Sequence, residues 1–289
     1  MGNREASNNR SDLTDRKASI NGKAPLPTKF PPASQQFYNT SQPYLAMLEA
    51  RQELDYRFII EAIRSYASGG TALDYGCGVG LLSMLLAKSG FTVAGVDISE
   101  QFIQSAKNRF GEASSLTFEV IGGIPLRFAD GIFDVITSSS VLEHCTRVDA
   151  ILLEFKRLLK TNGLLVIETP NLLSPLARLK LIFDRFIGRR KTFHRFGTPM
   201  FLLKSIYFLA RKLILRAPEF IYVKPHHSTF SEADEDVSYL SNPLDYLFFL
   251  RDNGFEVLEL SRNTGFIREL ISKRVPSIAG GVMIVARKK

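Results

Sequence analysis

The chain has 289 residues, 45% of them hydrophobic and 23% charged, with a formal net charge of +8 at pH 7, values typical of a globular protein that buries a sizeable core. Its two cysteines, Cys77 and Cys145, exclude a disulfide scaffold and a cysteine-based zinc cluster. No apolar run approaches the roughly 18 residues of a spanning helix, and no apolar stretch follows the N-terminal charges, so we expect a cytoplasmic protein without a secretory signal.

Residues 1–35 differ in composition from the rest of the chain. They carry a net charge of +3, are rich in Asn, Ser, Lys, Arg and Pro, and contain Phe30 as their single aromatic residue. Such a segment buries too little apolar surface to offset its ordering entropy. The sequence therefore predicts a disordered basic tail.

From residue 44 onward, helical and strand patterns alternate along the chain. Apolar spacing and capping residues predict helices over 44–67, after the glycine-rich turn at 76–80, over 99–110 and over 150–160. Predicted strands lie between them, at 71–75, 91–97, 116–121, 133–138 and 164–169. Because strands that alternate with helices form βαβ units, these five strands are expected to be parallel.

The C-terminal part breaks this alternation. Asn242-Pro243 suits the start of a helix that ends near Gly254, and strands are predicted at 255–261 and 281–287. Without a convincing crossover helix between them, the last two strands are expected to be antiparallel. The predicted fold is therefore α/β: a Rossmann-like, doubly wound, mostly parallel sheet of seven strands with an antiparallel C-terminal pair.

The turn after the first of these strands reads Leu73-Asp74-Tyr75-Gly76-Cys77-Gly78-Val79-Gly80. Glycines there let backbone approach a ligand closely, at the sheet edge where doubly wound folds bind ligands. Asp97 ends the next strand, where a carboxylate can accept hydrogen bonds from ribose hydroxyls. A dinucleotide fingerprint needs glycine where this chain has Leu81, and pyrophosphate would be poorly served beside Asp74. The spacing thus disfavours NAD and favours a cationic ligand.

Four stretches occur in order over about residues 70–171: LDYGCGVG, VAGVDIS, IPLRFADGIFDVI with VLEH behind it, and LLKTNGLLVIETPN. Together they resemble the class I S-adenosylmethionine-dependent methyltransferases, most closely the small-molecule branch called type 11. The resemblance implies a methyltransferase acting on a small-molecule or lipid-linked acceptor, with oxygen as the expected methylated atom. A non-catalytic relative that binds the cofactor without turnover and an NAD-binding Rossmann protein are the alternatives.

The resemblance also implies which residues hold S-adenosyl-L-methionine: Asp74, Gly76, Cys77, Gly78, Gly80, Asp97, Ile98, Gly122, Gly123, Ser138 and Ser139. Asp74 would lie near the methionine part, Asp97 would take the ribose hydroxyls, and the backbone around Ser138 would meet the amino group. Many relatives read the adenine with an acid after the third strand. Here Gly122-Gly123 stands at that place, so backbone would have to supply the contact.

An oxygen acceptor must lose its proton, commonly to a His or a carboxylate. His144 follows the fourth parallel strand and is a candidate base, metal ligand or positioning residue. Some relatives bind a divalent metal through E-x-x-E-H, but Ser140 replaces the first acid here, so no metal site is predicted. His226 and His227 are candidate bases or solvated loop residues. An acidic run follows, interpreted as a solvated loop or helix start: Glu232, Asp234, Glu235 and Asp236.

Residues 172–228 interrupt the methyltransferase domain, predicted at 36–171 and 229–289, and carry a net charge of +10. Two helices are expected in this insertion, from Pro175 to about Ile187 and from Pro199 to Leu215. Polar residues of the second helix fall within an arc of about 140°, namely Lys204, Ser205, Arg211, Lys212 and Arg216. Either the apolar remainder packs on the core as part of a substrate lid, or the helix lies on an anionic membrane. The long aliphatic face fits RNA less well, so nucleic acid is not an expected partner.

Overall fold

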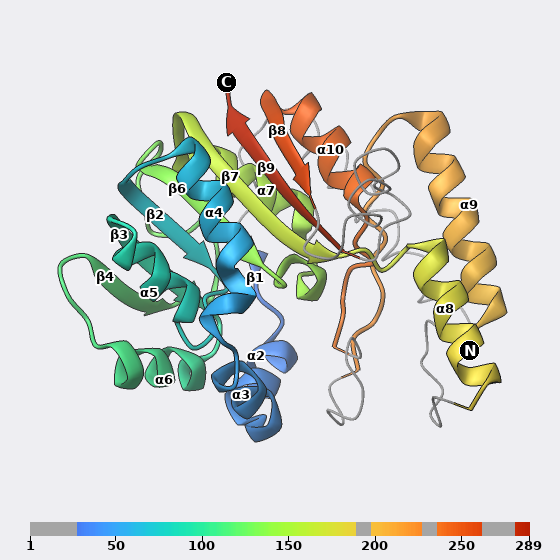
Figure 1. Cartoon of the computed structure of the whole chain (residues 1–289), viewed down its shortest axis with the longest axis horizontal. Coiled ribbons are helices and arrows are strands. Elements are labelled where there is room, and N and C mark those ends of the chain that lie inside the picture. The colour runs from blue at the N-terminus through green and yellow to red at the C-terminus, as the bar shows by residue number, and fades with distance from the viewer. Residues whose placement is uncertain (1–27, 189–197, 227–235, 262–280) are drawn as a thin grey trace, which may run out of the picture.

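The computed structural model of the chain describes residues 28–188, 198–226, 236–261 and 281–289. Its centre is a seven-stranded sheet with the strand order β4-β3-β2-β6-β7-β9-β8 (Figure 1). Five neighbouring strands are parallel: β4 (Leu116–Val120), β3 (Phe91–Asp97), β2 (Gly70–Tyr75), β6 (Phe133–Ser139) and β7 (Leu159–Pro170). Strand β9 (Gly281–Lys288) is antiparallel to both β7 and β8 (Phe255–Ser261). The predicted α/β fold is confirmed, including its antiparallel end.

Two layers of helices cover the sheet. One layer consists of α4 (Arg57–Tyr66), α5 (Leu81–Lys88) and α6 (Glu100–Phe110), and the other of α7 (Val148–Leu158) and α10 (Pro243–Asp252). Successive side chains of a strand point to opposite faces, so Ala72 packs under the first layer and Leu73 under the second. Side chains start the helices as predicted, since Ser99 Oγ accepts a hydrogen bond from Phe102 N and Asn242 Oδ1 accepts one from Leu244 N.

The two largest differences from the predicted boundaries concern one helix and one strand. The helix expected over 44–67 is divided into α3 (Gln42–Glu49), the 3₁₀ helix η1 (Glu53–Tyr56) and α4. Gln52 N donates to Asp55 Oδ2 at 2.9 Å, a capping interaction that starts a new helical segment. Strand β7 begins at Leu159 instead of 164, because Asn162-Gly163 lies within a strand irregularity, where Asn162 has a φ of 65°.

The predicted disordered tail is wrong for its last eight residues, while residues 1–27 lie outside the described part. Strand β1 (Thr28–Lys29) pairs antiparallel with β5 (Gly123–Ile124), and α2 (Pro32–Thr40) follows. Phe30 N donates to Gly122 O at 3.1 Å and its ring packs against the core, while Ser34 is buried. The composition of residues 28–35 does not predict this ordered structure, because the strand that pairs with β1 lies almost a hundred residues further along the chain.

The insertion contains α8 (Pro175–Phe186) and α9 (Pro199–Leu215), which lie side by side at one end of the molecule (Figure 1). The predicted helices are confirmed, and the polar arc of the second helix is divided between the interior and the surface. Ser205 and Lys212 are fully buried, whereas Lys204, Arg211 and Arg216 are exposed. Helix α9 thus turns part of its polar face inward, because Lys212 pairs with Asp245 of α10. None of the helices in the described part is long and apolar enough to cross a membrane.

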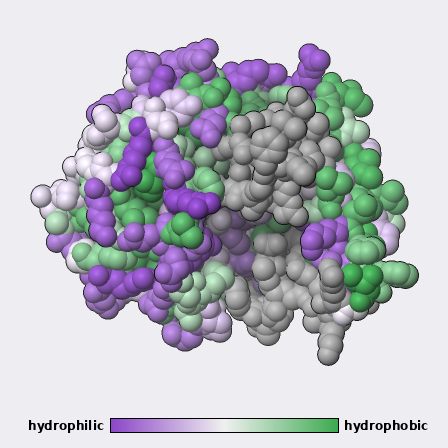
Figure 2. All heavy atoms as spheres, viewed as in Figure 1, coloured by the Kyte–Doolittle hydropathy of each residue, from purple (hydrophilic) through white to green (hydrophobic). Residues whose placement is uncertain are grey.

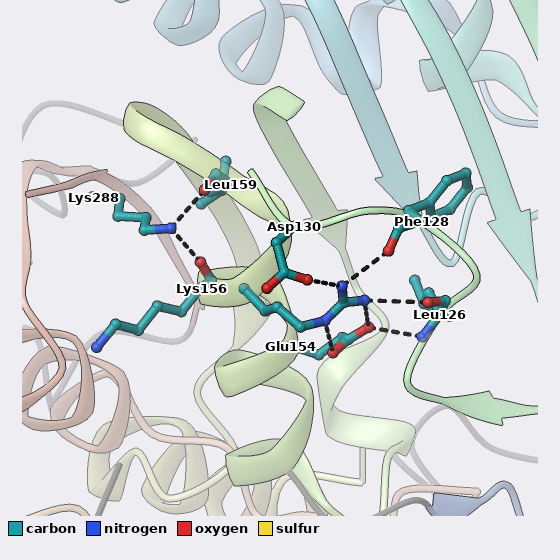
Figure 3. A network of polar contacts seen from close by, with 8 residues as sticks. Leu126, Phe128, Asp130, Glu154, Lys156, Leu159 and Lys288 are labelled. Carbon is teal, nitrogen blue, oxygen red and sulfur yellow. Dashed lines mark hydrogen bonds and ion pairs between the residues drawn. The ribbon is translucent and has the colours of Figure 1, made fainter. Parts of the chain in front are cut away.

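A polar network fixes the chain between β5 and β6 (Figure 3). The buried Glu154 carboxylate accepts hydrogen bonds from Leu126 N at 2.7 Å and from the Arg157 guanidinium, which also donates to Phe128 O and to Asp130. Nearby, Lys288 Nζ donates to the carbonyls of Lys156 and Leu159 at the end of α7. These contacts hold the 126–130 loop on α7, next to the segment from Ile121 to Ile124 that enters the site.

Candidate active site

A cavity of about 560 Å³ lies at the carboxyl edge of the parallel strands. Its walls come from the N-terminal helices, the glycine turn after β2, the end of β3, the segment after β6 and the adjoining ends of β7 and β9. This edge is where doubly wound sheets bind ligands. The described residues of the insertion from 175 to 226 do not line it.

The glycine turn is packed so closely that side chains would not fit. Gly76 has a φ of 75°, and a Cβ there would lie 2.3 Å from Val141 Cγ2. Gly80 has a φ of 81°, and a Cβ there would lie 2.7 Å from Phe118 Cζ. Both positions therefore require glycine. Gly76, Cys77 and Gly78 line the cavity, whereas Gly80 begins α5 behind them.

Asp97 connects the end of β3 to the glycine turn. Its Oδ2 accepts a hydrogen bond from Gly78 N at 3.0 Å, and its Oδ1 accepts one from Ser99 N at 2.9 Å. Burial raises the pKa of Asp97 to about 6, although the backbone N–H groups of Ser99 and Gly78 oppose that shift. Asp97 lines the cavity, as does Ile98 beside it. Because a carboxylate has about four lone-pair sites, Asp97 can still accept hydrogen bonds from ligand hydroxyls.

Asp74 lies behind the turn instead of on the cavity wall. It is 1% exposed, and its two oxygens accept hydrogen bonds from Ser83 Oγ at 2.6 Å and Thr137 Oγ1 at 3.0 Å. Burial raises the pKa of Asp74 to about 6 against these two hydrogen bonds. Its contacts join β2, α5 and β6 beneath the turn, so Asp74 can position the backbone that a ligand would meet.

The other residues assigned by resemblance are divided between the wall and the layer behind it. Ser139 lines the cavity and donates to Glu168 Oε2 at 2.7 Å, while Ser138 is buried and does not line it. Gly122 and Gly123 are absent from the wall, where their neighbours Ile121 and Ile124 stand. Their backbone pairs with the N-terminal segment around β1: Phe30 N donates to Gly122 O, and Lys29 stands opposite Gly123 in the strand register.

Of the candidate bases in the described residues, one lines the cavity and one does not. His144, in the 3₁₀ turn η2 (Leu142–His144), lines the cavity, and its Nδ1 lies 3.1 Å from Asp236 Oδ2. His226 is exposed and does not line the cavity, so its position does not support a role as base. His227 lies outside the described residues, as do Glu232, Asp234 and Glu235. No metal-binding group of three or more acidic, His or Cys side chains occurs in the described ranges.

Several wall residues were not predicted from the sequence. Helices α2 and α3 bring Tyr38 and Tyr44 to the cavity, and the two rings lie 5.3 Å apart at centroid distance with an edge-on geometry. Arg51, just after α3, and Glu168, near the end of β7, add a cation and a carboxylate. Glu143, next to His144, is buried and accepts a hydrogen bond from Thr169 Oγ1 at 3.2 Å. The VLEH stretch was the one sequence pattern that pointed to Glu143. No pattern in the N-terminal helices pointed to Tyr38 or Tyr44.

Comparisons with known proteins agree with this geometry. Residues 73–167 match the family described as "Methyltransferase domain". The ubiquinone biosynthesis O-methyltransferase of Rickettsia akari is 27% identical over 163 residues, which are 55% of this chain and 64% of that protein. The 2-methyl-6-phytyl-1,4-hydroquinone methyltransferase of Synechocystis is 37% identical over 104 residues, 36% of this chain and 33% of that protein. The chain thus spans less than two thirds of the length of these relatives.

Solved structures share the fold. The magnesium protoporphyrin IX methyltransferase of Synechocystis with bound SAH superposes with a TM-score of 0.54 at 15% identity, covering 89% of this chain and 98% of that one. An S-adenosylmethionine-dependent methyltransferase of Mesorhizobium loti gives a TM-score of 0.52 at 16% identity, covering 81% of this chain and 97% of that one.

Proposed function

We propose that this chain, in which residues 73–167 form a class I methyltransferase domain of the type 11 branch, methylates an oxygen of a small-molecule or lipid-linked acceptor with S-adenosyl-L-methionine. The observation that carries the proposal is that one cavity is lined by Gly76 and Gly78, by Asp97 and by His144. A nucleotide-binding edge and a proton acceptor thus face the same space.

The wall residues fit this cofactor. Asp97 would accept hydrogen bonds from the ribose hydroxyls, as its position at the end of β3 allows. The turn at Gly76 and Gly78 would let the backbone approach the nucleoside and methionine parts closely. Arg51 would supply positive charge for the methionine carboxylate.

When bound, S-adenosylmethionine supplies an electrophilic methyl group: the acceptor oxygen forms the C–O bond while the C–S bond breaks and its electron pair goes to sulfur. His144 would take the proton of the acceptor hydroxyl at Nε2. The aromatic rings of Tyr38, Tyr44 and Phe102 line the same space. They would align the acceptor and exclude water, and proximity can contribute much of the rate enhancement in such a displacement.

A lipid-linked acceptor is the version that we favour, because the insertion exposes an apolar surface away from the cavity. Figure 2 shows hydrophobic side chains gathered over α8 and α9, at the right of the view. We call this set the α8–α9 surface: Leu176, Leu179, Phe183, Phe186, Ile187, Met200, Leu203, Ile206, Tyr207, Leu213, Ile214 and Leu215. Phe186 is 88% exposed and Ile214 is 80% exposed. Soluble proteins rarely leave so many neighbouring apolar side chains in water.

Charge favours a membrane as the partner of this surface. The exposed bases Lys204 and Arg211 lie on α9, and Arg216 directly follows its last residue. Basic side chains near an anionic lipid surface each contribute about 1 kcal/mol of attraction. We therefore propose that α8 and α9 contact the cytoplasmic face of a membrane, where a quinone-type acceptor would be held. The names of the curated relatives, which include a ubiquinone O-methyltransferase and a phytyl hydroquinone methyltransferase, support that acceptor class.

The test uses methyl-labelled S-adenosylmethionine, incubated with the protein and with separated membrane and soluble fractions of a cell lacking it. Label that enters the lipid extract, and does not with Asp97→Ala, would support a methyltransferase with a lipid-linked acceptor. Label confined to soluble molecules would support a methyltransferase and contradict the lipid-linked acceptor. No label in any fraction, despite cofactor binding, would point to a non-catalytic relative.

A further inference from the structure

We infer that Asp236 is a positioning residue, which together with Tyr38 holds the His144 ring so that Nε2 is the nitrogen that accepts the proton. The inference rests on the proposed function, in which His144 is the base. It assigns a role to an acidic side chain that the sequence pattern placed in a solvated loop.

Two groups meet at one oxygen of Asp236. Tyr38 donates its hydroxyl proton to Oδ2 at 2.6 Å, and His144 Nδ1 lies 3.1 Å from the same oxygen. Asp236 is 5% exposed and Tyr38 is 7% exposed. The arrangement is therefore sheltered from water, and all three residues line the cavity.

This geometry selects a tautomer of the neutral ring. A carboxylate beside Nδ1 favours the proton on that nitrogen, and the other nitrogen is then the acceptor. His144 Nε2 is 3.9 Å from Glu143 Oε1, which is longer than a hydrogen bond. A ring protonated at Nδ1 carries its lone pair at Nε2, the nitrogen that the reaction requires.

The charges around His144 support the same role. They come from the carboxylates of Asp236 and of Glu143 on its own turn, while burial raises the pKa values of Tyr38 and Tyr44 so that both hydroxyls stay neutral. Burial works to raise the pKa of Asp236, but the charge of His144 and the hydrogen bond from Tyr38 lower it below the ordinary value. Asp236 is therefore ionised at neutral pH. By reciprocity its charge stabilises the imidazolium that forms when Nε2 takes the acceptor proton, and solvent then receives that proton.

Backbone contacts keep Asp236 in place. Ser238 N and Tyr239 N both donate to Glu143 O at 2.9 Å, so the segment after Asp236 is bound to the turn that carries His144. Val237 and Leu240 are buried in a small core with Leu172 and Leu173. Asp236 and His144 therefore belong to one packed unit although 92 positions separate them in the sequence.

The first test needs no acceptor and measures the ring nitrogens of His144 by ¹⁵N NMR, with the resonances assigned by His144→Gln. In the wild type we expect the neutral ring to be protonated at Nδ1. In Asp236→Asn we expect a mixture of tautomers and a titration midpoint below that of the wild type, and Tyr38→Phe should give a smaller change in the same direction. Asp252→Asn, which changes an exposed carboxylate paired with Arg251, should leave both readouts unchanged. An unchanged tautomer and midpoint in Asp236→Asn would overturn the inference.

The second test measures label transfer into the membrane fraction across a range of pH. We expect Asp236→Asn to lower the rate about 10- to 100-fold, by analogy with the partners that orient metal-bound histidines, with cofactor affinity unchanged. Asp236→Glu should recover part of the rate, which a fold defect would not explain. If His144→Gln transfers label as fast as the wild type, the proposed base is wrong. If His144→Gln is slow and Asp236→Asn is as fast as the wild type, His144 remains the proposed base and the positioning role of Asp236 is wrong.

Discussion

Lys212 Nζ of α9 lies 2.5 Å from Asp245 Oδ1 of α10, and both side chains are completely buried. Asp245 Oδ1 also accepts a hydrogen bond from Glu219 N at 2.8 Å, and its Oδ2 accepts one from Tyr239 at 2.7 Å. Burial lowers the pKa of Lys212 and raises that of Asp245, while the attraction between them opposes both shifts. The pair fixes α9 so that Leu203, Ile206 and Ile214 face outward, whereas Phe201 and Phe208 pack inward. The outward side chains belong to the surface that we propose contacts a membrane.

Removal of Lys212 should therefore destabilise the protein strongly. Lys212→Met leaves the Asp245 carboxylate buried without its cation, and breaking such a pair typically costs about 3–5 kcal/mol. Urea unfolding followed by circular dichroism measures this loss. Lys212→Met combined with Asp245→Asn should recover part of it, because no charge then remains buried. Arg211→Met is the matched control, since the neighbouring Arg211 pairs with Glu219 at the surface, and its unfolding midpoint should stay close to that of the wild type.

The sheet and its connections could be predicted because local patterns specify them. Strand alternation, the glycine turn and the caps at Ser99 and Asn242 are all encoded within a few residues, and each was found where the sequence placed it. The direction of α9 could not be predicted in this way. Its polar arc contains one lysine whose partner, Asp245, lies 33 positions further on, and no spacing rule within a helix identifies such a partner.

The residues of the site differ in the same way in how far the sequence predicts them. The residues contributed by the ends of β2 and β3 were predicted, since parallel strands bring their carboxyl ends together. The walls formed by Tyr38, Arg51 and Asp236 were missed, because these residues come from segments whose patterns indicate only helix or loop. Asp74 was assigned to the ligand, yet its hydrogen bonds to Ser83 and Thr137 place it behind the turn.

Asp74 should make stability depend on pH. Its pKa in the folded protein is about 6 against an ordinary value of 3.8, so the folded state binds the proton more tightly than the unfolded state. Stability is then greatest below pH 4 as far as this group is concerned, and falls as pH rises through 6, by on the order of 3 kcal/mol.

Asp74→Asn should remove that part of the pH dependence. The amide stays neutral, and the hydroxyls of Ser83 and Thr137 can each donate or accept. Urea unfolding at pH 4.5 and pH 7.5 measures the difference for wild type and variant, with Asp252→Asn as the control for a surface carboxylate. Equal slopes against pH for Asp74→Asn and wild type would show that Asp74 is not a buried acid with a raised pKa.

Asp97 should determine cofactor affinity. Asp97→Ala removes a carboxylate that can accept two ribose hydroxyls, a loss of about 1–3 kcal/mol or roughly 5- to 150-fold in Kd. Isothermal calorimetry with S-adenosylmethionine measures it. Because the variant also leaves Gly78 N and Ser99 N without their acceptor, Asp97→Asn provides a second variant that keeps one oxygen. An affinity equal to that of the wild type in both variants would remove Asp97 from the cofactor site.

The α8–α9 surface should bind anionic vesicles through apolar and basic side chains together. In cosedimentation with phosphatidylglycerol–phosphatidylcholine vesicles, the double variant Phe186→Asp/Ile214→Asp should lose binding, because it places two charges where the helices enter the lipid. Leu54→Asp is the matched control: Leu54 is 65% exposed but belongs to η1, outside this surface.

The basic side chains supply the second part of this binding. Lys204→Glu/Arg216→Glu should weaken binding to the anionic vesicles and reduce its sensitivity to salt, since charges near a lipid surface act within a Debye length of about 10 Å at 0.1 M salt. Lys212 is not a suitable target, because it is buried against Asp245. If the wild-type protein stays in the supernatant with anionic vesicles, the α8–α9 surface is not a membrane contact, and a protein partner would then have to cover its exposed Phe186 and Ile214.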